Sequence, residues 1–126
     1  MASSSPSEQE IQQHIRLACG RGPVRLWRNN TGALVDQQGR FVRFGLCKGS
    51  SDLIGLQSVV VTPEQVGMRI ARFVALEIKT PTGMVSPEQR AFLRLVERLG
   101  GVAAVCRSIG EAEQILGIGA AAEAAA

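Results

Sequence analysis

The chain has 126 residues, of which 45% are hydrophobic and 20% charged, and a formal net charge of +3, which predicts one globular domain with a single core. Aromatic residues make up only 4% of the sequence, which argues against a nucleic-acid platform of stacked rings. The three cysteines form no CxxC pair, so a disulfide framework or a thiolate zinc site is not expected. A reducing, cytoplasmic location fits best. No apolar run reaches the roughly 20 residues that span a bilayer, so no membrane partner is expected.

The ends of the chain differ in composition from its middle. Residues 1–6 are expected to form a flexible leader, and residues 117–126, which are rich in alanine, a low-complexity tail. The domain itself is expected at 7–116. It should begin with a helix over 8–19, because Ser7 and Glu10 form a capping-box pattern.

Inside that first helix, Ile11, Ile15 and Ala18 recur at helical spacing and predict a buried stripe. A β-rich middle follows, with turn residues at 29–32 and 36–39. The strands are expected at 24–28, 40–44, 53–61 and 69–79.

The second helix has the clearest signals in the sequence. Ser86 is the expected N-cap, Pro87 takes the first helical position, and Gln89 completes a capping box. Gly100 and the glycine after it end the helix. A buried strand at 102–106 and a short helix opened by Ser108 come next. The order of elements predicts an α/β fold with a mixed β-sheet flanked by helices.

The chemistry is expected at the end of the strand over 69–79. Alternation places Glu77 and Lys79 on one face, while Val74, Leu76 and Ile78 form an apolar face toward a core. Sites in α/β sheets commonly form at such strand ends.

Asp52 precedes the strand over 53–61. If that strand and the one over 69–79 form a hairpin, Asp52 comes near Glu77 and Lys79. Paired carboxylates repel each other, and a divalent cation relieves this repulsion. Oxygen ligands favour Mg²⁺ or Mn²⁺. A third carboxylate is expected from the first helix, where Glu8 lies on the inward stripe and is preferred to Glu10.

Each of these residues also has a simpler interpretation. Glu77 and Lys79 could form a solvated cross-strand pair, Asp52 could close a turn, and Gln89 could act only as a cap. A basic path for nucleic acid is a further hypothesis, against ordinary solvated charge. Its members are Arg28, Asn29, Asn30, Lys48 and Arg90.

Taken together, the motifs resemble the VRR-NUC (virus-type replication-repair nuclease) family of the PD-(D/E)xK nuclease superfamily. Asp52 followed by Glu77-Ile78-Lys79 gives the D…ExK pattern. The other matching pieces, which cover about residues 7–106 in order, are the SEQEIQ helix, the Arg28–Gly32 turn, the Lys48–Leu53 loop and Ser86–Gln89.

The resemblance implies a restriction-endonuclease-like core that hydrolyses DNA with Mg²⁺ or Mn²⁺. It implies metal ligands at Glu8, Asp52, Glu77 and the carbonyl of Ile78. Lys79 would activate water, and Gln89 would support the site. Small members of the family that stand alone are often bacterial or phage-encoded, and they resemble Holliday-junction resolvases that act as homodimers.

The function expected from the sequence is therefore metal-dependent endonucleolytic cleavage of branched or otherwise structured DNA. Two alternatives stay open. The same site could serve flap, nick or restriction-type cleavage, or the fold could serve as a non-catalytic nucleic-acid-binding module.

Overall fold

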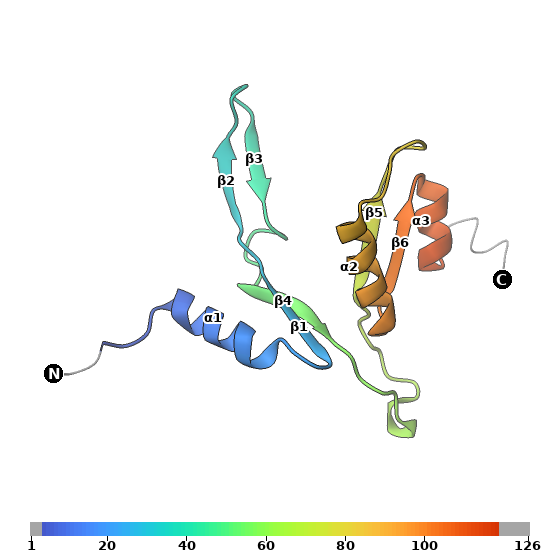
Figure 1. Cartoon of the computed structure of the whole chain (residues 1–126), viewed down its shortest axis with the longest axis horizontal. Coiled ribbons are helices and arrows are strands. Elements are labelled where there is room, and N and C mark those ends of the chain that lie inside the picture. Colours follow the sequence, from blue (N-terminus) through green and yellow to red (C-terminus); the bar gives the residue numbers. More distant parts are fainter. Residues whose placement is uncertain (1–3, 119–126) are drawn as a thin grey trace. The chain divides into compact units, whose positions relative to one another are not determined.

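The computed structural model describes residues 4–118, which divide into two compact units, Met1–Val59 and Val60–Ala126 (Figure 1). Each unit is described by itself. Part of the predicted leader and most of the predicted alanine-rich tail lie outside the described residues. Between residues 4 and 118 no helix has both the length and the apolar character needed to cross a membrane.

The first unit is built on a helix and a two-stranded ribbon. Helix α1 (Glu8–Cys19) begins as predicted, with the Ser7 hydroxyl accepting the Glu10 N–H at 3.2 Å. Strands β1 (Val24–Arg28) and β4 (Leu53–Gln57) pair antiparallel, with Arg28 opposite Leu53. The ribbon needs glycine at position 55, because a Cβ there would lie 1.8 Å from the Arg25 carbonyl oxygen.

The stripe predicted to be buried on α1 is only partly covered. Ile11 and Ile15 are 44% and 43% exposed, and no residue of α1 is buried. The prediction was wrong on this point, because within its unit α1 packs against a narrow ribbon rather than a full sheet (Figure 1).

A second hairpin extends from the same unit. Strands β2 (Gly32–Val35) and β3 (Phe41–Phe44) pair antiparallel around a turn that Asp36 organises. The Asp36 carboxylate accepts the backbone N–H groups of Gln38 and Arg40, and it also pairs with the Arg40 guanidinium at 2.9 Å. The Arg40 N–H bond is the main reason that the pKa of Asp36 lies below its ordinary value.

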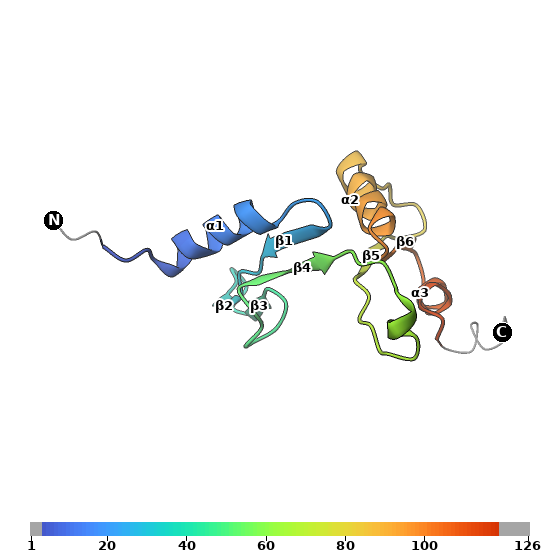
Figure 2. The same cartoon turned by 90° about the horizontal axis from the view of Figure 1, so that it is seen from below.

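The second unit is a β–α–β arrangement. After the 3₁₀ turn η1 (Pro63–Gln65), strand β5 (Val74–Ile78) pairs in parallel with β6 (Val102–Cys106). The connection between the two strands is helix α2 (Pro87–Arg98), and α3 (Ile109–Leu116) follows β6. Helices α2 and α3 lie on opposite sides of the strand pair (Figures 1 and 2).

The two buried hydrophobic residues of the described chain both lie in the second unit. Val96 on α2 and Cys106 on β6 are 0% and 1% exposed. The residue before β6 is Gly101. A glycine is needed there, because a Cβ would lie 2.7 Å from Val96 Cγ1 and 2.8 Å from the Phe73 carbonyl oxygen. This close approach seats α2 over the strand that carries Glu77.

The α/β class, with antiparallel and parallel strands, is confirmed. The predicted hairpin of 53–61 with 69–79 is wrong, because β4 pairs with β1 and β5 pairs with β6. Both strands are also shorter than predicted. The apolar face expected on β5 is not buried, since Val74 and Ile78 are 45% and 67% exposed. Helix α2 covers the opposite face, and α3 packs mainly on β6.

Candidate active site

Glu77 is the centre of a small polar cluster in the second unit. Its Oε1 accepts a hydrogen bond from Gln89 Nε2 at 2.8 Å and lies 3.7 Å from Lys79 Nζ. The Glu77 and Lys79 side chains are 29% and 21% exposed. The two charges are therefore partly shielded from water and lie side by side at the end of β5, as strand alternation predicts.

Gln89 connects this cluster to the start of α2. Its Oε1 accepts the Ser86 N–H at 2.9 Å, while its own N–H donates to the Ser86 hydroxyl at 3.1 Å. Since a backbone N–H can only donate, the Gln89 oxygen must face Ser86, and the amide nitrogen must face Glu77. The cap and the contact to Glu77, which the sequence offered as alternatives, occur together.

The two oxygens of Glu77 have different surroundings. Oε1 has both partners, Gln89 and Lys79. Within residues 4–118, Oε2 has no hydrogen bond or ion pair. Glu77 is thus held by one oxygen and offers the other to a cation or a water proton.

Glu8 and Asp52 come together in the first unit. Both line one open cavity of about 370 Å³, beside Gln12 and Leu53. Both residues are exposed, and in the described part of the chain neither carboxylate forms a hydrogen bond or an ion pair. Glu10 does not line this cavity. The carboxylate next to Asp52 is therefore Glu8, the residue preferred from helical spacing.

Asn29 fixes the backbone that carries Asp52. The Asn29 N–H donates to the Asp52 carbonyl at 2.8 Å. Its side-chain amide donates to Ser50 Oγ at 2.7 Å and to the Ser51 carbonyl at 2.9 Å, and its oxygen accepts the Leu46 N–H at 2.9 Å.

From its place in the turn after the strand over 24–28, Asn29 is a hypothetical contact to nucleic acid. The structure shows instead a side chain only 9% exposed, with its amide engaged inside the protein. This anchoring role was missed. The available signal was an Asn at the end of a strand, a residue type that bonds nearby backbone readily.

The other residues considered for nucleic-acid contact are exposed: Arg28, Asn30, Lys48 and Arg90. Arg28 ends β1 in the first unit, and Arg90 lies on α2 in the second.

The candidate metal ligands have the chemistry that a hard divalent cation prefers, because they are carboxylate oxygens without a partner in the described part of the chain. The first unit offers Glu8 and Asp52, and the second offers Glu77 Oε2 beside the exposed residue Ile78. Among residues 4–118, no group of three or more His, Cys, Asp or Glu side chains is placed to hold a metal.

Comparison with known proteins adds one finding. The model of the VRR-NUC domain family matches residues 7–109, a span that includes Glu8, Asp52, Glu77, Lys79 and Gln89. No curated protein and no solved structure matches the chain.

Proposed function

The chain belongs to the VRR-NUC family and so carries a nuclease domain of the PD-(D/E)xK type, and on this premise we propose that it is a metal-dependent DNA endonuclease. The observation that carries the proposal is the cluster of Glu77, Lys79 and Gln89. A carboxylate held by an amide, with an ammonium beside it, is what a water-activating site requires.

Lys79 is assigned the role of positioning and polarising the attacking water through its ammonium group. Its Nζ lies 3.7 Å from Glu77 Oε1, close enough for the carboxylate to orient it by charge. Gln89 holds Glu77 so that Oε2 stays free. The contacts among the three side chains support these roles, with Glu77 on β5, Lys79 directly after it and Gln89 on α2.

The cofactor of this proposal is Mg²⁺ or Mn²⁺. The residues that would hold it are Glu8, Asp52, Glu77 and the carbonyl of Ile78, and Asn29 fixes the backbone at Asp52. When bound, such a cation lowers the pKa of a water ligand and stabilises charge on a phosphoryl oxygen. The assignment of the four ligands to one cation follows the family signature.

The substrate of the proposal is branched or otherwise structured DNA, cut by a homodimer that presents two sites, as in Holliday-junction resolvases. Flap, nick and restriction-type cleavage would use the same residues. Arg28, Asn30, Lys48 and Arg90 would contribute contacts to phosphate, which orient a duplex without reading its sequence.

The test is cleavage of labelled DNA by the full chain. A four-way junction, a flap and a linear duplex are each incubated with Mg²⁺, with Mn²⁺ or with EDTA. Lys79→Ala and Asp52→Asn are expected to reduce the cleavage rate by roughly 10²-fold or more. Arg98→Ala, which removes a charge from the exposed last turn of α2, is the matched control and should keep the wild-type rate.

Three outcomes are informative. Metal-dependent cutting of the junction by the wild type, lost in both variants, supports the full proposal. Preferential cutting of another substrate keeps the site and replaces the resolvase assignment. A folded wild-type protein that binds DNA and cuts none of the substrates would overturn the catalytic proposal in favour of a binding module.

A further inference from the structure

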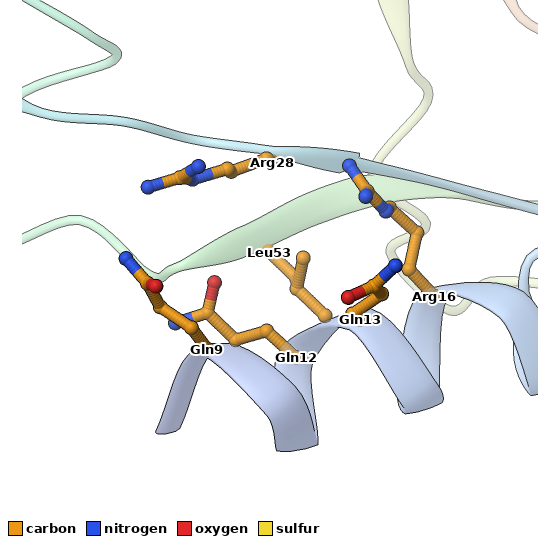
Figure 3. A pocket seen from close by; sticks show the side chains of 6 residues that line it. All are labelled: Gln9, Gln12, Gln13, Arg16, Arg28 and Leu53. Atoms are coloured by element: carbon orange, nitrogen blue, oxygen red, sulfur yellow. The ribbon is translucent and has the colours of Figure 1, made fainter. Parts of the chain in front are cut away.

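A second pocket of the first unit lies between α1 and the β1–β4 ribbon. Its volume is about 230 Å³. In Figure 3 the α1 side chains point toward the ribbon, with the Arg28 guanidinium at the Gln9 end of the row and the Arg16 side chain at the other end. The lining residues, here called the arginine pocket, are Gln9, Gln12, Gln13, Arg16, Arg28 and Leu53.

The charge of the arginine pocket is unbalanced. Two guanidinium groups and three amides line it, and no carboxylate does. Between residues 4 and 118, neither the Arg16 nor the Arg28 side chain forms an ion pair or a hydrogen bond. Arg40 shows the contrast, because its guanidinium pairs with Asp36 at 2.9 Å. The pocket therefore suits an anion with several acceptor oxygens.

Helical spacing explains why four side chains of α1 line the same pocket. Gln9, Gln12, Gln13 and Arg16 follow one another at i, i+3, i+4 and i+7 along α1, so they share one face of the helix. Arg28 reaches the same space from the last residue of β1.

The arginine pocket adjoins the cavity that Glu8 and Asp52 line. Gln12 and Leu53 line both. The same helix thus carries a carboxylate in its first turn and a guanidinium in its last turn. A ligand with regularly spaced anionic groups can place one group at each cavity. A cation held by Glu8 and Asp52 would bind one group, and Arg16 and Arg28 would bind the next.

We propose that the arginine pocket binds the phosphate of a DNA strand next to the phosphate that is cut. The proposal rests on the proposed nuclease function and names a positioning site for its substrate. Arg16 and Arg28 supply paired N–H donors to the phosphate oxygens. The glutamine amides add neutral donors. Because every nucleotide has the same phosphate, this contact sets the register of the strand without selecting a sequence.

The experiment compares Arg16→Gln, Arg28→Gln and the double variant with Arg21→Gln. Arg21 is exposed, belongs to the same unit and lines neither cavity, so its substitution removes equal charge elsewhere. Binding of fluorescent duplexes of two unrelated sequences is measured by anisotropy at several salt concentrations. Ca²⁺ replaces Mg²⁺ so that the DNA stays uncut. Thermal melting of each variant confirms folding.

Each pocket substitution should weaken binding about tenfold, equally for both sequences, and lower the salt slope by about 0.9 per lost phosphate contact. The Arg21→Gln control should show a smaller change. In cleavage assays KM should rise while kcat is kept. Lys replacements at Arg16 and Arg28 should recover part of the affinity.

Two results would overturn the inference. One is equal weakening by Arg21→Gln, which would reduce the effect to net charge. The other is a loss confined to one sequence, which would make the pocket a reader of bases. A wild type that cuts no DNA but keeps arginine-dependent, sequence-independent binding would refute the nuclease proposal while supporting the phosphate site.

Discussion

The two carboxylates of the D…ExK signature are held in opposite ways. In the second unit the Glu77 side chain is fixed through Oε1 by Gln89 and Lys79. In the first unit the Asp52 side chain has no partner within residues 4–118, and only its backbone is fixed, through the Asn29 N–H. Glu77 is therefore held by contacts of its side chain, and Asp52 by a contact of its backbone.

This difference follows from the local folds. Gln89 is 12 residues from Glu77, and both belong to one β–α–β unit whose helix cap fixes the amide. The position of Asp52 depends on the loop before it, which Asn29 holds by hydrogen bonds to residues 17 to 22 positions away in the sequence. A substitution that disturbs Glu77 should therefore act on chemistry first, and one that disturbs the Asp52 loop should act on stability first.

The largest effect is expected at Gln89. Gln89→Glu keeps an oxygen for the Ser86 N–H, so the helix cap survives. It replaces the donor to Glu77 with a second carboxylate. The cleavage rate should fall by roughly 10–100-fold, because Glu77 Oε1 loses its amide donor and gains a like charge beside it.

Gln89→Ala is the companion variant, because it removes the side-chain half of the capping box as well as the contact to Glu77. It should lose about 1 kcal/mol of stability, whereas Gln89→Glu should melt near the wild-type temperature. Equal melting and equal cleavage for the two variants would show that the cap and the contact are not separable.

A change at Asn29 should act mainly on stability. Asn29→Ala leaves the Leu46 N–H and the Ser51 carbonyl without their partner in a partly buried position, which should cost about 1–2 kcal/mol. Urea denaturation measures this loss. Asn30→Ala, at the exposed neighbour, should change stability by less than about 0.5 kcal/mol. Similar losses at both positions would remove the special role of Asn29.

The smallest effect is expected at the hairpin turn. Because the pKa of Asp36 is lowered in the folded chain, its ionised form stabilises the turn above the ordinary carboxyl pKa, and that contribution is lost as the pH falls through the folded value. Asp36→Asn should lack this pH-dependent part. Amide chemical shifts of 32–44, followed from neutral to acid pH, should show a wild-type transition that the variant does not share.

Local signals predicted much of the fold. The helix starts at Ser7, Ser86 and Ser108 could be predicted because a capping serine acts within three residues of sequence. Strand pairing could not, because period-2 alternation says which face a residue takes and nothing about its partner strand. The predicted hairpin of 53–61 with 69–79 failed for that reason.

The candidate site divides in the same way. Glu77 and Lys79 are two residues apart on one strand, so alternation alone places them together. The contact of Gln89 with Glu77 could not be predicted from the capping box, since that pattern does not say which strand the amide faces; only the family resemblance implied a supporting role. The burial of Asn29 depends on Leu46, Ser50 and Ser51, whose approach no local pattern encodes.

The contact between Gln89 and Glu77 has one further consequence. Resonance makes the two oxygens of a free carboxylate equivalent, and rotation about the last side-chain bond exchanges them. In this chain the helix cap makes the two oxygens different. The Ser86 N–H orients the Gln89 side-chain amide, and that amide donates a hydrogen bond to Glu77 Oε1. The direction of the Ser86 N–H, nine residues further along the chain, thus sets which Glu77 oxygen is bound and which stays free.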